Sequence, residues 1–346
     1  MPGKNRITIS FRDHRGEFPT LPTISDGTRF IDCYHEKPKG WTSLIHLAQT
    51  NASARELLVE IAKCGFLVYR APELGTQFVH RSAVSEVWKP LINNEYRVSR
   101  DGVVYRLARP RHDGHTSSLV VVFSSVAANR FSQLLDRNFA SFMPSLESVV
   151  GGHTAVLRIA DLDGVVGGYY LPTASNPRAA TNVQNLMEEV AASLELRRNH
   201  IVTLGGSKGG TGALWHAIAF GSHCVAIDPI ITHNRRSESG RDPYFVCSSI
   251  FPRTFDSEFD ALLTNTEPYP NIQRMIITSK NSAEYPDISR LARRHQDADL
   301  KIVESLDPHI THHANVARNS MAITLALVNS LAQGLPISLP SKSQVC

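Results

Sequence analysis

A serine flanked by glycines stands between a predicted strand and a predicted helix. Ser207 is the centre of Gly205-Gly206-Ser207-Lys208-Gly209, which follows a β-branched apolar run and precedes an Ala-rich helical stretch. On so tight a turn, the residues two before and two after the serine must lack bulk. The spacing therefore predicts a nucleophile elbow, in which Ser207 projects at a helix N-terminus and attacks an acyl carbon.

Other interpretations of these glycines are weaker. A phosphate-binding loop needs Gly-x4-Gly-Lys-Ser/Thr, and Thr211 stands where the lysine is required. The dinucleotide pattern Gly-x-Gly-x-x-Gly cannot be placed between 205 and 212. The plain structural alternative is a Gly-rich turn in which Ser207 caps the helix. We favour the nucleophile.

A serine hydroxyl needs a general base, and three histidines compete for that role. In folds with this motif the order along the chain is Ser, acid, His, and the histidine follows the last strand. His309, His312 and His313 all lie there. His313 is nearest the start of the final helix and is the first choice, with His312 as the alternative. A metal site built from the three is not favoured, because no Glu stands at the helical spacing of a zinc-protease pair.

The carboxylate that orients the histidine has three candidates. Asp228 follows the predicted strand 224–227, whereas Glu284 and Asp287 follow the predicted strand 275–279. The usual hydrolase position favours the later pair, and Glu284 is closer to the strand end, so it is the first choice. The structural alternatives are that Asp228 simply ends a strand and that Asp287 caps a helix.

Two backbone amides are expected to hold the oxyanion. One is the N–H of Lys208, the residue after the nucleophile, and the other comes from the loop at Ser125, after the first parallel strand. The side chain of Lys208 is expected to face solvent. The alternative is that it binds an anionic sugar or a phosphate near the site.

Composition places the chain among ordinary globular proteins. The 346 residues carry a net charge of +4 at pH 7, which does not support a nucleic-acid-binding surface. Five scattered cysteines lack Cys-x-x-Cys spacing and indicate a reducing cytoplasm. The N-terminus has no apolar signal core, and the longest apolar stretch, 321–331, is too short to span a bilayer. We expect a soluble cytoplasmic protein with no bound cofactor.

The elements that must position these residues begin near residue 118, where strands and helices start to alternate. The expected parallel strands are 119–124, 155–159, 201–204, 224–227, 275–279 and 301–303. The expected helices are 129–138, 178–195, 208–220, 257–264, 287–296 and 315–332. This alternation is typical of a parallel sheet with helices on both faces. The elbow serine follows the third of these strands.

The first third of the chain has a different pattern. It contains an expected helix at 54–64, a short strand at 66–69 and a hairpin at 96–108 that turns at Asp101-Gly102. We therefore predict an N-terminal α+β segment (1–115), whose end contributes antiparallel edge strands. An α/β-hydrolase-like catalytic domain (116–335) and a short tail (336–346) follow.

Several segments together resemble the XcbB/CpsF family of capsular polysaccharide biosynthesis proteins, which is related to accessory Sec-system proteins that O-acetylate glycans. The resemblance is carried by 121–125, 129–131, 157–161, 167–170, 205–214, 226–230, 277–279 and 313–316. Ser-Lys-Gly-Gly at 207–210 is the most specific of these. The family's last motif is expected to read His-Pro-Asp-Val, but Ala314 and Asn315 follow His313 here. The resemblance implies a Ser/acid/His site acting on acyl esters of sugars in cell-surface polysaccharide production.

The expected function is thus a serine-dependent esterase or sugar O-acyltransferase that works through an acyl-enzyme. Its substrate would be a saccharide or glycan, its partners polysaccharide-assembly proteins, and acetyl-CoA a co-substrate rather than a bound cofactor. One alternative is a non-catalytic assembly protein that kept the fold. Another is a sugar-phosphate transferase that uses Lys208 with Arg235, Arg236 and Arg241.

Overall fold

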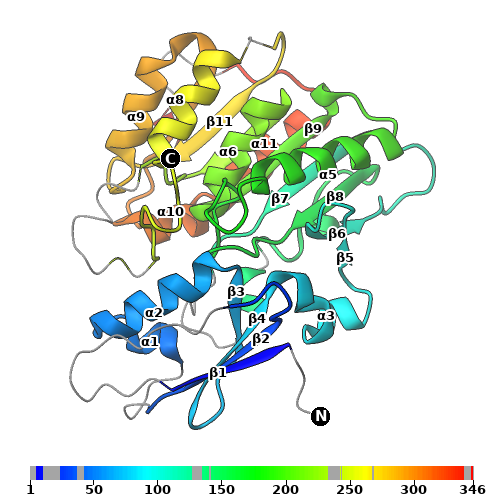
Figure 1. The fold of residues 1–346 in the computed structure, drawn as a ribbon. Coiled ribbons are helices and arrows are strands. Elements are labelled where there is room, and N and C mark those ends of the chain that lie inside the picture. Colours follow the sequence, from blue (N-terminus) through cyan, green and yellow to red (C-terminus); the bar gives the residue numbers. More distant parts are fainter. Residues whose placement is uncertain are drawn as a thin grey trace.

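The chain forms two sheets that lie side by side (Figure 1). The computed structural model describes residues 5–10, 24–36, 43–126, 135–139, 142–232, 242, 244–266, 269–338 and 344–345. A four-stranded sheet has the order β1-β2-β4-β3, and a nine-stranded sheet has the order β13-β12-β11-β10-β9-β7-β8-β6-β5. The predicted site residues all belong to the part of the chain that builds the larger sheet.

The small sheet and two helices form the N-terminal module. Its elements are β1 (Arg6–Ser10), β2 (Phe30–Tyr34), α1 (Leu44–Leu47), α2 (Ala52–Lys63), β3 (Phe66–Arg70) and β4 (Gly75–His80). Asn51 caps α2 by accepting the N–H of Ala54, as its residue type favours. The helix expected at 54–64 and the strand expected at 66–69 are both present, with bounds shifted by one or two residues.

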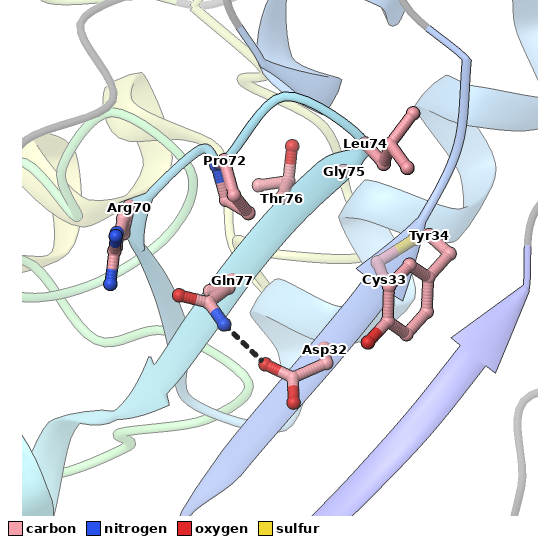
Figure 2. Close-up of a pocket in the computed structure, with 9 residues that line it drawn as sticks. All are labelled: Asp32, Cys33, Tyr34, Arg70, Pro72, Leu74, Gly75, Thr76 and Gln77. Carbon is pink, nitrogen blue, oxygen red and sulfur yellow. Dashed lines mark hydrogen bonds between the residues drawn. The ribbon is translucent and has the colours of Figure 1, made fainter.

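A cavity of about 330 Å³ lies beside β2 and β4 of this module (Figure 2). Two of its polar side chains pair with each other, because Gln77 Nε2 donates to Asp32 Oδ1 at 2.9 Å. Arg6, outside the lining, forms an ion pair with the same carboxylate at 2.7 Å. Tyr34 and Leu74 line its rim and are exposed. None of the residues that the sequence singled out for chemistry lines this cavity.

The larger sheet has a parallel centre and an antiparallel edge. Its strands are β5 (Arg97–Val98), β6 (Val104–Ala108), β7 (Ser118–Phe123), β8 (Thr154–Ile159), β9 (Ile201–Gly206), β10 (His223–Ile227), β11 (Arg274–Thr278), β12 (Leu300–Ser305) and β13 (Gln344–Val345). The strands from β7 to β12 pair in parallel, which confirms the six expected parallel strands. The hairpin β5–β6 joins β8 antiparallel, as expected. In the tail, β13 pairs with β12.

Helices cover both faces of this sheet (Figure 1). They are α4 (Leu146–Val149), α5 (Ala179–Ser193), α6 (Lys208–Phe220), α8 (Phe255–Asn265), α9 (Tyr285–Arg294), α10 (His313–Asn319) and α11 (Met321–Ala332). Apolar residues of α5, α6, α8 and α9 share one core cluster with alternate strand residues, and those of α4, α10 and α11 share the other. This alternation explains why strands buried on both faces are apolar throughout.

Two expected helices differ from the structure. The helix expected at 315–332 is two helices, α10 and α11, that meet at Ser320. Ser320 stands between them with φ −110° and ψ 19°, and its hydroxyl bonds back to the carbonyl of Val316, a local contact that favours a bend in a helix. Of the helix expected at 129–138, residues 129–134 lie outside the described part, and 135–138 form a 3₁₀ turn rather than an α-helix.

The N-terminal module is joined to the larger sheet by a common apolar core. Ile31, Leu57 and Phe78 of the module belong to the same buried cluster as Tyr169 and Phe255. Such a shared core couples the two sheets by burial of apolar surface. Within the described residues, no helix has the length and apolar character needed to cross a membrane.

The thiols of the described cysteines Cys33, Cys64, Cys224 and Cys247 are free. Burial raises the pKa of both Cys33 and Cys224 to about 12. Because the thiolate is the reactive form of cysteine, these two side chains are inert packing groups.

Candidate active site

Ser207 occupies the strained backbone that a nucleophile elbow requires. It stands between β9 and α6 with φ 53° and ψ −120°, a region that non-glycine residues rarely adopt. A Cβ on Gly205 would lie 2.2 Å from the carbonyl oxygen of Gly209, and a Cβ on Gly209 would lie 2.2 Å from that of Phe123. Both contacts are with backbone, which cannot move aside. The two glycines therefore allow the turn that exposes Ser207.

An unbroken hydrogen-bonded chain runs from Ser207 through His313 to Asp228. Ser207 Oγ lies 2.7 Å from His313 Nε2, and His313 Nδ1 lies 2.7 Å from Asp228 Oδ2. Asp228 is almost wholly buried, whereas the imidazole of His313 is partly exposed. Because β9 and β10 are parallel neighbours, their carboxyl ends bring Ser207 and Asp228 to the same edge of the sheet. His313 reaches them from the first residue of α10.

Hydroxyl groups from the end of β11 hold the carboxylate of Asp228. Thr278 Oγ1 donates to Oδ1 at 2.5 Å, and Ser282 Oγ donates to Oδ2. The backbone N–H of Asp228 also bonds to Ile277 O at 2.7 Å, with φ at 44°. These contacts aim the carboxylate at the ring. Sequence reasoning missed Thr278 and the role of Ser282, although hydroxyl residues at the end of a strand and in the loop after it could have indicated them.

The carboxylate that orients His313 in this structure belongs to Asp228, which was the alternative candidate. The first choice from the sequence was Glu284. Glu284 stands at the N-terminus of α9, and its backbone N–H bonds to Ser282 Oγ at 3.2 Å. Asp287 is buried in the first turn of that helix and pairs with Arg290. The physical reason is sheet order: Asp228 ends the strand beside β9, while Glu284 and Asp287 follow the next strand out.

Neither of the other two histidines contacts Ser207. His309 is exposed, and its Nδ1 lies 2.9 Å from Asp307 Oδ1. His312 precedes α10 as its N-cap and is exposed as well. Within the described ranges no group of three His, Cys, Asp or Glu side chains is placed to hold a metal ion.

The two segments expected to supply oxyanion donors lie against each other. Lys208 is the first residue of α6, so its backbone N–H belongs to the unpaired first turn. Ser125 follows β7, and its hydroxyl donates to the carbonyl oxygen of Gly206 at 2.7 Å. This bond ties the loop after β7 directly to the elbow.

The side chain of Lys208 does not face solvent, and that expectation is wrong. It is 0% exposed, and its Nζ forms an ion pair with Asp161 Oδ2 at 2.7 Å. The elbow turns α6 inward, so its first residue points into the core toward the loop after β8. A lysine held this way cannot receive an anionic substrate. Arg235, Arg236 and Arg241, which the phosphate alternative also needed, lie outside the described residues.

The arrangement has the parts needed for acyl transfer. His313 Nε2 can take the proton of Ser207 as the hydroxyl attacks, and Asp228 can stabilise the imidazolium that results. The unpaired first-turn amides of α6, which begins directly after Ser207, can stabilise negative charge that develops there.

Comparison with known proteins adds evidence on the fold. No protein-family model matches the chain, and no curated protein sequence matches it either. Among solved structures, the capsule O-acetyltransferase of Neisseria meningitidis serogroup A in complex with caged gadolinium is similar with a TM-score of 0.50 and 12% identity, over 69% of this chain and 93% of that one.

Two further structures are similar at lower scores. An arylesterase has a TM-score of 0.43 and 15% identity, over 69% of this chain and 83% of that one. A Glycosylation Associate Protein (Gap123) complex from Streptococcus agalactiae has a TM-score of 0.48 and 15% identity, over 74% of this chain and 49% of that one. With its strand order and its elbow between β9 and α6, the chain has an α/β-hydrolase-like fold.

Proposed function

We propose that this protein is a serine-dependent acyl-ester enzyme with Ser207 as nucleophile, His313 as general base and Asp228 as the orienting acid. The observation that carries the proposal is the pair of 2.7 Å contacts that link the three side chains. Residues from three separate segments converge here, and the serine among them has strained backbone. Such strain persists only where the surroundings enforce it, and it gathers at functional sites.

The reaction proceeds in two steps. Ser207 Oγ bonds to the acyl carbon while its proton passes to His313 Nε2, and the backbone N–H groups of Lys208 and Ser125 hold the oxyanion. The C–O bond of an ester substrate, or the C–S bond of a thioester donor, then breaks, and His313 returns the proton to the departing oxygen or sulfur. Water or a sugar hydroxyl attacks the acyl-enzyme by the same route in reverse, and this regenerates Ser207.

A carbohydrate is the proposed substrate class. Support comes from the resemblance of segments between 121 and 316 to capsular polysaccharide biosynthesis proteins, and from the presence of a capsule O-acetyltransferase among the similar folds. We propose an O-acyl sugar, or a glycan hydroxyl with acetyl-CoA as donor, handled in the cytoplasm together with polysaccharide-assembly proteins. Transfer requires that the acceptor exclude water from the acyl-enzyme.

A fluorophosphonate probe and a p-nitrophenyl acetate assay test the nucleophile. Wild type should be labelled on Ser207 and should release nitrophenol, and both signals should vanish in Ser207→Ala. Asp228→Asn should lower kcat by about 10⁴-fold, because a neutral amide no longer stabilises the imidazolium or its tautomer. The matched control is Glu284→Gln, an acid from the next strand end that should leave kcat unchanged.

Two outcomes contradict this assignment. An active wild type that the probe does not label would rule out Ser207 as the nucleophile. A loss of activity in Glu284→Gln comparable with that in Asp228→Asn would contradict Asp228 as the orienting acid and favour Glu284, which follows β11.

A further inference from the structure

We propose that a closed ring of buried contacts sets the distance between the two oxyanion amides, and that Lys208, Asp161 and Tyr170 are positioning residues of the site through their side chains. This inference rests on the proposed function and deepens it. The ring starts and ends at the elbow, and its links are hydrogen bonds and one ion pair.

The first half of the ring runs from the elbow to Tyr170. Ser125 Oγ bonds to Gly206 O at 2.7 Å, and the backbone N–H of the preceding residue, Ser124, bonds to Tyr170 Oη at 2.5 Å. Tyr170 Oη in turn donates to Ile159 O at 3.0 Å, at the end of β8. Burial raises the pKa of Tyr170 well above its usual range, so the phenol keeps the proton that this bond needs. The phenol thus holds the backbone beside Ser125.

The second half runs from Tyr170 back to the elbow through a carboxylate. Asp161 accepts the backbone N–H of Gly168 at 2.8 Å on Oδ1, and that of Tyr169 at 2.9 Å on Oδ2. Lys208 Nζ donates to the same Oδ2 at 2.7 Å. Since Lys208 directly follows Ser207, its side chain closes the ring. The ammonium also lies 5.4 Å from the centre of the Tyr170 ring.

The loop that Asp161 holds is strained in a way that needs such an anchor. Tyr169 and Tyr170 have φ of 57° and 61°, each in the left-handed region that bulky residues avoid. Such a conformation costs free energy and persists only where its surroundings enforce it. A Cβ on Gly167 would lie 2.5 Å from both Asp161 Oδ2 and Lys208 Nζ. The backbone of the loop therefore packs directly against the ion pair.

The stability of α6 does not explain a lysine at position 208. A cation in the first turn of a helix opposes the helix dipole. Removing both charges of a buried pair is often neutral for stability. The Lys208–Asp161 pair is therefore better explained by what it holds in place than by the helix that carries it.

The catalytic consequence follows from the geometry of oxyanion binding. The amides must stand about 2.7–3.1 Å from the oxyanion, and a shift of about 1 Å far from the chemistry can cost about 100-fold in rate. Such donors act mainly in the transition state, so a misplaced amide should lower kcat and leave KM unchanged.

Two variants test the ring while keeping the core filled. Tyr170→Phe removes only the hydroxyl, and the double variant Lys208→Met with Asp161→Asn removes both charges together. Each should lower kcat for p-nitrophenyl acetate by about 10- to 100-fold with KM within about twofold, and should weaken a boronic acid inhibitor, a tetrahedral mimic, by a similar factor. Assays belong well below the midpoint of thermal unfolding, with the folded fraction measured by circular dichroism.

The matched control is Asp163→Asn, which alters a carboxylate on the same loop outside the ring. It should keep wild-type kcat and wild-type boronic acid affinity. Folded ring variants with wild-type kcat would overturn this inference alone, as would an equal loss of kcat in Asp163→Asn. A wild type that the fluorophosphonate probe fails to label would overturn the proposed function first, and the inference with it.

Discussion

Asp161 and Asp163 lie in the loop between β8 and α5, and each forms an ion pair with a different part of the molecule. Asp161 and its partner Lys208 are 3% and 0% exposed, and they face the elbow. Asp163 is 7% exposed, but its partner Arg81 is 26% exposed and belongs to the segment that follows β4 of the N-terminal module. We call these the inner pair and the outer pair. The loop between β8 and α5 therefore connects the candidate active site with the module.

The pairs differ in how their carboxylates are compensated. Asp161 has one cation and two backbone amides, whereas Asp163 also accepts hydrogen bonds from three neutral side chains, those of Thr173, Ser175 and Asn176. Even so, burial raises the pKa of Asp163, so the fold disfavours its charged form. The outer carboxylate can therefore lose its charge at little cost, whereas a change to only one member of the inner pair leaves a buried charge without its partner.

The largest difference in unfolding free energy between the two pairs should appear when the aspartate of each pair is replaced by asparagine. Asp161→Asn leaves the ammonium of Lys208 buried without a counter-charge, and such a break typically costs about 3–5 kcal/mol of unfolding free energy. Asp163→Asn should cost less than about 1 kcal/mol, because solvent reaches Arg81. Urea denaturation of both variants measures the difference. Equal losses would show that the inner pair is no more dependent on its partner than the outer one.

The second-largest effect should come from low pH, through protonation of His216. His216 contacts a residue of the ring that includes the inner pair, because its Nε2 lies 3.0 Å from Tyr170 O, and burial lowers the pKa of its imidazole to about 4. The folded pKa lies below the unfolded value of about 6.5, so the neutral ring contributes stability above about pH 6.5, and this is lost as pH falls toward 4. The loss is about 3 kcal/mol. Unfolding free energy measured from pH 7 to pH 4 should fall more in wild type than in His216→Gln, and parallel curves would contradict the assignment.

Removal of the cation of the outer pair should have a smaller effect than acid. Arg81→Met removes a partly exposed ion pair and should cost about 1 kcal/mol of unfolding free energy. Hydrogen exchange of the backbone amides in β4 should become faster, while kcat for p-nitrophenyl acetate stays at the wild-type value. A drop in kcat would mean that the outer pair also supports the site, and the contrast between the pairs would then disappear.

Much of the larger sheet could be predicted from residue patterns. The runs at 119–124 and 224–227 are apolar throughout because both faces of the sheet are covered, and each matches its strand within one residue. The pattern failed at one break: an apolar stripe runs through 315–332, but the structure has two helices that meet at Ser320, whose hydroxyl bonds to the carbonyl of Val316. Hydrophobic periodicity has no means of reporting such a bond.

The elbow follows from residue types alone, because the steric demand on Gly205 and Gly209 is local to five residues. The order of motifs along the chain also places His313 after β12, where α10 begins. Which carboxylate contacts that histidine, and where Lys208 points, depends on how the chain packs. Those contacts join residues 85 and 47 positions apart, and they depend on which strand ends lie side by side in the sheet. Local patterns specify the strands, whereas the order of the strands arises only when the chain packs.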